Sequence, residues 1–305
     1  MPSVTVTGAT GTIGRALVGE LRARGDEVTA LSRDAESASS LLGVEALSWR
    51  DPKGEPPPAD ALRGRDAVVH LLGETIAQRW SDEVKREIRD SRIMSTRGLV
   101  AAIGALPESE RPRALVCQSA TGWYGPRGDE RLTEDEPAGG DFLAHVVVDW
   151  EAEARRAEGH GLRVVTTRTG VVLSEQGGAL EKMLPFFKLG IGGPVAGGRQ
   201  YVAWVHLDDV VGALLSCIDG ELSGPVNVTA PEPATNKELS HALGLVLKRP
   251  AFAPVPGLAV KTLYGEMAVI VITGHRAVPK RLQDEGYAFR RPELEAALRD
   301  ATGRS

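Results

Sequence analysis

The stretch VTVTGATGTIG, from Val4 to Gly14, decides the fold of this chain of 305 residues. Its first four residues form a β-branched run, which predicts a short buried strand. Gly8, Gly11 and Gly14 follow at three-residue intervals, and an apolar stripe up to Arg24 then predicts a helix. A strand that enters a helix through three glycines is typical of a dinucleotide-binding turn.

Each glycine of this turn has a separate physical task. The first permits a tight turn, the second lets the backbone approach a pyrophosphate, and the third lets the helix pack closely on the strand. The free N–H groups and the positive dipole end of the helix then face the phosphates. We therefore expect the turn to bind a dinucleotide through five of its residues, which are Gly8, Thr10, Gly11, Thr12 and Ile13.

The composition is that of an ordinary globular protein. The formal charge is -5 and no basic run stands out, which argues against a nucleic-acid partner. Both cysteines, Cys117 and Cys217, lie in apolar segments and are expected to be buried thiols in a reducing compartment. No signal peptide or membrane-spanning stretch is evident. The sequence therefore predicts a cytoplasmic protein without membrane or metal, and it leaves a homodimer open.

The end of the second predicted strand, Glu27 to Ser32, indicates the cofactor. NAD-binding folds place an acid about 20 residues after the glycines, where it holds the ribose 2′-hydroxyl. This chain has Ser32-Arg33 there, and a guanidinium suits a 2′-phosphate because it offers charge and a planar donor fork. Asp34 is the competing detail, since it would serve NAD if the strand ended one residue later. We favour NADP(H).

Strands alternate with helices over the first 170 residues, which predicts a doubly wound parallel sheet of the Rossmann type. The further strands are predicted at Val44 to Trp49, Ala67 to Leu72, Ala114 to Gln118 and Arg163 to Thr169. Long helices are predicted at Ser81 to Leu106 and Phe142 to Glu158. Strand ends of such sheets bind ligands, so we expect Glu74, Ser119, Tyr124 and the loop after Val172 to converge at one mouth.

The chain changes character after Leu173. Gly177 to Tyr201 is too rich in glycine for a regular element and is expected to be an adaptable lid. Thr235 to Glu238 has capping-box spacing, and Leu258 to Thr273 is predicted as a helix. We expect residues 1–173 to form the NADP-binding Rossmann domain, rejoined by about 202–219. Residues 174–201 and 220–305 would then form a smaller C-terminal substrate domain.

The order of motifs resembles an atypical extended short-chain dehydrogenase/reductase. It is most similar to the "epimerase family" branch, whose members carry a C-terminal domain of unassigned function. Among the residues that carry the resemblance are the glycine turn, Leu31 to Arg33, His70 to Glu74, Arg79-Trp80, Glu87 to Arg92, Ser119 to Gly125, Trp150-Glu151, Arg168 to Leu173, Gly192 to Pro194 and Trp204 to Asp209. The resemblance implies that NADP(H) is held by the glycine turn and by Ser32, Arg33, Leu71, Leu72, Glu87, Arg92 and Val172.

The catalytic slots depart from the usual pattern. Ordinary members use a Ser or Thr with a Tyr-x-x-x-Lys pair on a helix, where the ammonium lowers the pKa of the neighbouring phenol. Counting back from Trp150-Glu151, the tyrosine slot holds His145 and the lysine slot holds Asp149. Counting back four residues from Tyr124, the hydroxyl slot holds Ala120. The standard hydride mechanism cannot simply be transferred to this chain.

Substitutes for the missing groups can be named. His145 with Asp149 is either an acid–base pair or a solvated helix pair, and the sequence favours the second. Tyr124 and Ser119 are further catalytic candidates, whereas His206 is expected to be a structural group at a helix entrance. Two functions follow: an NADP(H)-dependent oxidoreductase or epimerase-like enzyme acting on a small molecule, or a catalytically weak NADP(H)-binding regulator. A nucleotide-sugar epimerase proper is a third interpretation, which the absence of its proton-transfer tyrosine disfavours.

Overall fold

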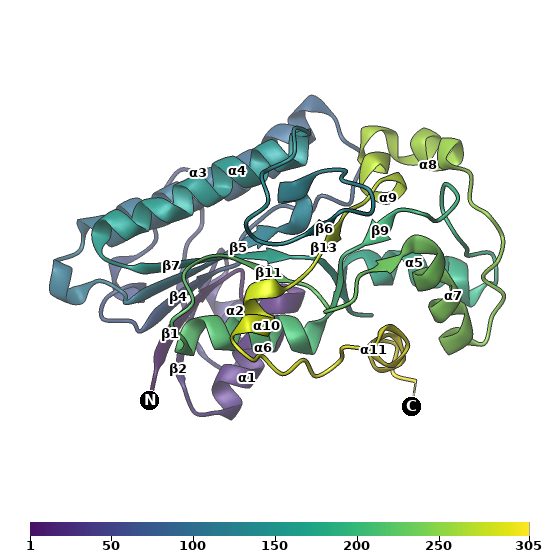
Figure 1. Cartoon of the computed structure of the whole chain (residues 1–305). Coiled ribbons are helices and arrows are strands. Elements are labelled where there is room, and N and C mark those ends of the chain that lie inside the picture. Colours follow the sequence, from purple (N-terminus) through teal and green to yellow (C-terminus); the bar gives the residue numbers. More distant parts are fainter. Residues whose placement is uncertain (305) are drawn as a thin grey trace.

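A seven-stranded parallel sheet forms the centre of the computed structural model, which describes residues 1–304 (Figure 1). The strand order is β11-β7-β5-β4-β1-β2-β3, so the order reverses beside β1, as the doubly wound prediction requires. The strands are β1 (Ser3–Thr7), β2 (Glu27–Ser32), β3 (Glu45–Ser48), β4 (Ala67–His70), β5 (Ala114–Ala120), β7 (Arg163–Thr169) and β11 (Gly224–Val228).

Helices cover both faces of this sheet. One face packs against α1 (Thr12–Ala23), α2 (Ala35–Leu42) and α6 (Leu207–Asp219), and the other against α3 (Asp82–Ala105) and α4 (Phe142–Arg155). Successive strand residues point to opposite faces, so Leu115 joins the α3–α4 core while Val116 joins the α1–α6 core. Because both faces are covered, Thr5 and Thr7 of β1 are as fully buried as Val4 and Val6.

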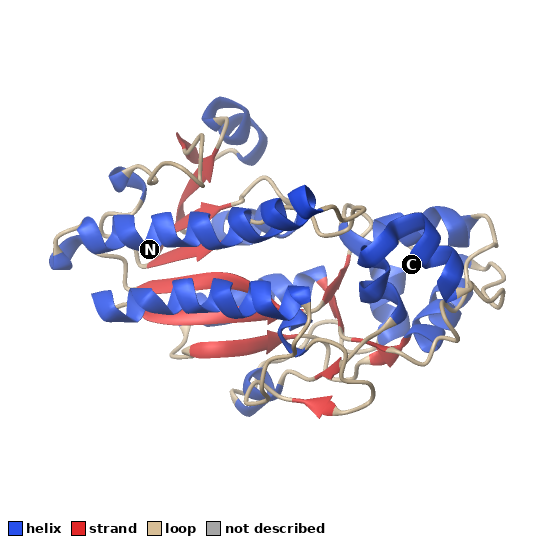
Figure 2. Cartoon of the chain, turned by 90° about the horizontal axis from the view of Figure 1, so that it is seen from above, coloured by secondary structure: helices blue, strands red, loops and turns tan. Residues whose placement is uncertain are grey.

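A smaller helical lobe gathers at one end of the molecule around the C-terminus (Figure 2). Its helices are α5 (Gly178–Lys188), α7 (Asn236–Leu247), α8 (Gly257–Tyr264), α9 (Val269–Ile272) and α11 (Leu294–Ala301), whereas α10 (Lys280–Asp284) packs on β11. Leu184, Phe187, Trp204, Leu243 and Leu298 belong to its core. The predicted capping box is present, because the Thr235 hydroxyl accepts the Glu238 N–H and Glu238 binds back to the Thr235 N–H.

Three two-stranded ribbons connect the sheet with the helical lobe. They pair β8 (Val171–Leu173) with β10 (Trp204–His206), β9 (Tyr201–Val202) with β12 (Ala234–Thr235), and β6 (Arg131–Leu132) with β13 (Arg276–Ala277). The first and third are parallel and the second is antiparallel. They lie beyond the carboxyl ends of the main strands, where a ligand of such a sheet is expected.

The structure corrects some expectations for the second half of the chain. The prediction that Gly177 to Tyr201 holds no regular element is wrong, because α5 forms there around the apolar stripe Leu180, Leu184 and Phe187. The helix expected from Leu258 to Thr273 is interrupted at Gly265, whose φ of 63° is incompatible with a helix. β11 is the seventh strand of the main sheet. The domain division expected from the sequence, which ends the Rossmann domain at about residue 219, would assign this strand to the smaller C-terminal domain.

None of the helices in residues 1–304 is both long enough and apolar enough to cross a membrane.

Candidate functional site: a glycine turn beside a buried ion-pair network

The glycine turn has the geometry that its spacing predicts. Gly8 has a φ of 65°, and a Cβ added at Gly14 would stand 2.3 Å from the Gly8 carbonyl oxygen. Gly8 therefore serves the turn, and Gly14 serves the close packing of helix on strand. Gly11 is the N-cap of α1 at a φ of -75°, and the nearest atom to an added Cβ is the Gly8 oxygen, 3.3 Å away.

The first turn of α1 is free to accept an anion. No side chain caps this helix in the described part of the chain, so its first N–H groups point outward from Thr12 and Ile13. Thr10 is exposed beside them. A cradle of backbone N–H groups that lacks a side-chain cap fits the pyrophosphate of a dinucleotide.

A second segment approaches the same turn from the helical lobe. The Thr12 hydroxyl donates to the Gln176 carbonyl at 3.3 Å, and a Cβ added at Gly177 would stand 2.3 Å from the Thr12 Oγ1. This segment leads from β8, which contains the half-buried Val172, into α5. The loop after Val172 therefore lies over the glycine turn, as expected for a segment that contacts a bound cofactor.

The end of β2 settles what Asp34 does. Its carboxylate caps α2 by accepting the Ser37 N–H at 3.0 Å and the Ser37 hydroxyl at 2.7 Å, and these bonds lower the pKa of Asp34. The Ser32 hydroxyl accepts the Asp34 N–H at 3.3 Å. Arg33 is exposed, with no side-chain partner among residues 1–304. The acid is thus engaged in a helix cap, while the guanidinium beside it stays open to solvent.

Arg92 fixes the loop that follows β4. Its guanidinium donates to the Glu74 carbonyl at 2.9 Å and to the Ile88 carbonyl at 2.8 Å, and it lies over the Trp150 ring. Burial lowers the pKa of Arg92 to about 10. The loop it holds begins with Leu71 and Leu72, both half-buried. Arg92 therefore holds the loop after β4 against α3 from its buried side.

Glu87 lies on the exposed side of α3. Lys53 binds its carboxylate at 2.7 and 2.9 Å, and both side chains are about two-fifths exposed. In this arrangement the carboxylate of Glu87 is neutralised by a neighbour across the loop after β3.

Ser119 belongs to a buried ion-pair network. Its hydroxyl donates to Glu151 at 2.6 Å, and Glu151 also accepts two hydrogen bonds from Arg168, at 2.8 and 3.0 Å. The side chains of Glu151 and Arg168 are 2% and 3% exposed. The guanidinium also stacks on the Trp123 ring, 3.8 Å from its centroid. Ser119 therefore points into the protein, between β5, β7 and α4.

Tyr124 is part of the same network and is fully buried. Its hydroxyl lies 2.7 Å from the Asn227 Oδ1 and 2.9 Å from the Thr133 carbonyl, and it accepts from Arg168 at 3.3 Å. Burial raises the pKa of Tyr124 to about 12. A phenol that is buried, hydrogen-bonded and hard to ionise is placed to hold the end of β5 together, not to exchange protons with a substrate.

His145 and Asp149 lie on the same helix but form no hydrogen-bonded pair in the described part of the chain. Both are exposed on α4, but the Asp149 carboxylate lies 3.6 Å from the Arg89 guanidinium of α3. Ala120, in the remaining slot, ends β5. The three slots thus provide one solvent-exposed imidazole and no phenol or ammonium.

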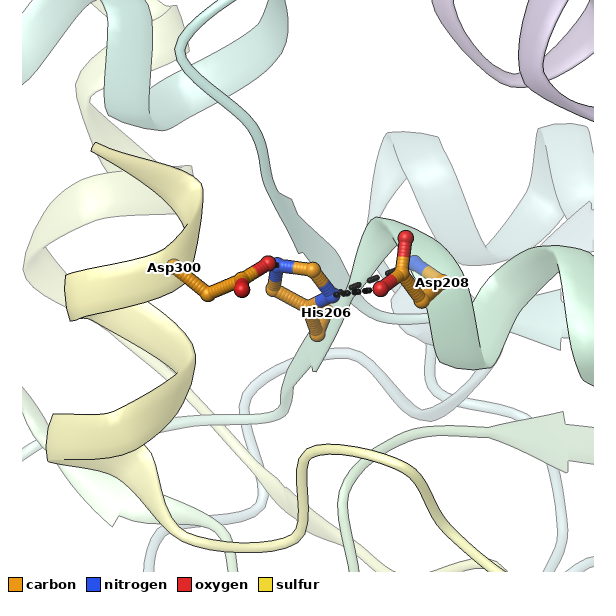
Figure 3. A group of neighbouring side chains, drawn as sticks. All are labelled: His206, Asp208 and Asp300. Carbon is orange, nitrogen blue, oxygen red and sulfur yellow. Dashed lines mark hydrogen bonds and ion pairs between the residues drawn. The ribbon is translucent and has the colours of Figure 1, made fainter. Parts of the chain in front are cut away.

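His206 ties the C-terminal helix α11 to the end of β10 and the start of α6 (Figure 3). As expected, it stands at a helix entrance, where its Nδ1 accepts the Asp208 N–H at 3.2 Å and caps α6. Its Nε2 therefore carries the proton and faces the Asp300 carboxylate of α11 at 3.2 Å. Both ring nitrogens are used in structural contacts. Burial lowers the pKa of His206.

Comparison with known proteins agrees with this geometry. The model of the NAD dependent epimerase/dehydratase family matches residues 4–228, and a domain of unknown function, DUF1731, matches residues 255–301. The chain belongs to the NAD dependent epimerase/dehydratase family. Epimerase family protein Mb2239 of Mycobacterium bovis is 42% identical over 99% of this chain and 98% of that protein. The chloroplastic SDR39U1 homolog of Arabidopsis thaliana is 39% identical over 97% of this chain and 86% of its own length.

A solved relative in this family shares the fold of the whole chain. The crystal structure of human epimerase family protein SDR39U1 with NADPH is 35% identical, with a TM-score of 0.89, and covers 99% of this chain and 100% of that one. The resemblance drawn from the motifs is thereby confirmed. The sequence reasoning missed the roles of Glu151, Arg168 and Asn227, because these polar residues lie in separate segments and no local spacing brings them together.

Proposed function

We propose that this family member binds NADP(H) at the edge formed by the glycine turn, the end of β2 and the loop after Val172. The carrying observation is the uncapped N-terminus of α1 behind a glycine turn whose Gly8 and Gly14 admit no side chain. When bound, NADP(H) would supply hydride chemistry. The protein would supply the backbone N–H groups for the pyrophosphate.

Selection of the 2′-phosphate rests on the end of β2. Asp34 is engaged in capping α2, so it is not poised to hold a ribose 2′-hydroxyl. Arg33 is exposed next to Ser32 and offers charge and a donor fork to a phosphate. The NADPH in the human relative's crystal structure supports the same choice of cofactor.

The activity we propose is that of an oxidoreductase or epimerase-like enzyme acting on an unidentified small molecule. The free, buried thiols of Cys117 and Cys217 fit a cytoplasmic protein. A second function, a catalytically weak NADP(H)-binding regulator, is favoured by one specific observation. The slots for the usual catalytic groups hold Ala120, an exposed His145 and an Asp149 that pairs with Arg89.

The test is a titration of the protein with NADPH and NADH, monitored by cofactor fluorescence. Gly11→Val is expected to abolish binding of both, because its side chain would occupy the path of the pyrophosphate. Gly19→Val is the matched control, since Gly19 is exposed on the same helix with nothing within 4 Å of an added Cβ. Binding that survives Gly11→Val with an unchanged circular dichroism spectrum would refute the assignment.

The two functions separate in a second measurement. An enzyme would show absorbance changes from NADPH oxidation or NADP⁺ reduction with some member of a panel of carbonyl and hydroxyl compounds. A regulator would bind NADPH without turnover across the panel, and its affinity for a partner would change with the redox state of the cofactor.

A further inference from the structure

Two arginines lie side by side where the sheet meets the helical lobe. Arg131 of β6 and Arg276 of β13 are register partners in a parallel ribbon, so their side chains leave the same face. The next pair, Leu132 and Ala277, is fully buried on the opposite face. Figure 1 shows this ribbon between the main sheet and the C-terminal helices.

Neither guanidinium has an acidic partner. Within residues 1–304, no ion pair or side-chain hydrogen bond involves Arg131 or Arg276. The Nε of Arg276 is buried and has no hydrogen-bond partner. By contrast, the buried guanidinium of Arg168 is satisfied by both oxygens of Glu151. Leaving a buried N–H donor without an acceptor costs folding free energy. A ligand oxygen that accepted from the Nε of Arg276 would remove this cost.

The guanidinium of Arg276 is held in place before any ligand arrives. It lies over the ring of Tyr201, 5.2 Å from the centroid. The segment that leads into β13 packs closely on β9, because a Cβ added at Gly274 would stand 2.0 Å from the Tyr201 carbonyl oxygen. The backbone beside Arg276 is therefore packed directly against the residue whose ring its guanidinium contacts.

We propose that Arg131 and Arg276 form an oxyanion site that takes the phosphate group of a small ligand. The two arginines start from neighbouring strands, whose backbones lie about 5 Å apart, so like charges share one face of the ribbon and an anion bound by both would offset their repulsion. The planar donor forks of two arginines match the oxygens of a phosphate. Such a ligand would give the buried Nε of Arg276 its acceptor.

This site uses other elements than the glycine turn, the end of β2 and the loop after Val172. It is built on β6 and β13, which are not strands of the seven-stranded sheet, whereas the glycine turn follows β1. The proposal does not rest on the proposed function, and it stands even if the chain does not bind NADP(H).

The experiment is isothermal titration of the full chain with inorganic phosphate at constant ionic strength, with and without saturating NADPH. Wild-type protein is expected to bind phosphate saturably in both conditions. Arg276→Gln should weaken phosphate by about tenfold or more, the usual effect of a hydrogen bond to a charged group, and Arg131→Gln by roughly threefold because it is exposed. Arg155→Gln, an exposed arginine at the end of α4, is the charge-matched control and should bind phosphate as wild type does.

Three results would overturn the site: no saturable binding to wild type, loss of phosphate binding when NADPH is present, or an equal loss in Arg155→Gln. If Arg276→Gln does not fold, the exposed Arg131→Gln decides, and unchanged affinity in that variant refutes the proposal. A parallel titration with glycerol phosphate identifies the source of the anion. Tighter binding of the ester supports an organic phosphate, and tighter binding of the free ion supports inorganic phosphate.

Discussion

The edge of the sheet at the glycine turn and the neighbouring edge at the end of β5 use polar groups in opposite ways. At the turn, the first N–H groups of α1 and the guanidinium of Arg33 are left open to solvent. At β5, Ser119 and Tyr124 are bound to groups of the protein itself. Open donors at one edge suit a ligand, and satisfied groups at the other suit stability. We therefore expect substitutions at the glycine turn to change cofactor binding and substitutions at the end of β5 to change stability.

The largest effect should come from breaking the buried network. Glu151→Ala leaves the Arg168 guanidinium buried without its carboxylate, so we expect about 3–5 kcal/mol less unfolding free energy in urea. Glu87→Ala is the matched control, because its pair with Lys53 is exposed and is worth about 0–1 kcal/mol. Equal losses in the two variants would show that the network is not the main support of this edge.

The buried imidazole behind the glycine turn should make stability depend on pH. His70 lies 2.8 Å from the Thr7 hydroxyl, and burial lowers its pKa to about 3 from an ordinary 6.5. The unfolded chain takes up a proton near pH 6.5 and the folded chain does not, so stability is full above pH 6.5 and falls on acidification. The slope is about 1.4 kcal/mol per pH unit, which gives roughly 2 kcal/mol at pH 5.

The measurement for this prediction is the unfolding free energy at pH 7 and pH 5 for wild type and His70→Asn. The difference between the two pH values should shrink in the variant by roughly 2 kcal/mol. The comparison with the variant is needed because burial also lowers the pKa of His275, to about 4. Identical pH dependence in both proteins would contradict a neutral, buried His70.

Tyr124→Phe sharpens the contrast between support and catalysis. Removing the hydroxyl leaves the Asn227 Oδ1 without its donor, so stability should fall by roughly 1–2 kcal/mol. NADPH affinity and any turnover should stay unchanged. If Tyr124→Phe keeps full stability and loses turnover, Tyr124 is a catalytic residue and this prediction is wrong.

The smallest effect is expected at His145. Its imidazole is exposed and its neighbour Asp149 is engaged with Arg89, so His145→Ala should leave stability, NADPH affinity and turnover as they are. If His145 is instead the working acid, turnover would fall by roughly 10²–10⁴-fold with affinity unchanged.

The parts predicted from the sequence are those that local patterns encode. The turn at Gly8, the strand from Glu27 to Ser32 and the capping box at Thr235 each depend on neighbouring residues, and each forms as predicted. The sequence analysis did not predict α5, because the many glycines on both sides of its apolar stripe are typical of a loop.

In the candidate site, too, the parts encoded by neighbouring residues could be predicted and the parts built from distant residues could not. The cofactor edge follows from a contiguous stretch of sequence. The partners of Ser119 and Tyr124 come from β7, α4 and β11, at separations of 32 residues for Glu151 and 103 for Asn227. Only the folded chain shows that these two hydroxyls are committed to internal bonds.

The central claim is that the cofactor edge binds NADP(H) and selects its 2′-phosphate through Arg33. The most direct measurement is the dissociation constant of NADPH and of NADH for wild type and Arg33→Ala. Our account predicts that NADPH binding weakens by about 1.5–3 kcal/mol, or roughly 10- to 150-fold, while NADH binding hardly changes. An equal loss for both cofactors, or no loss for NADPH, would contradict it.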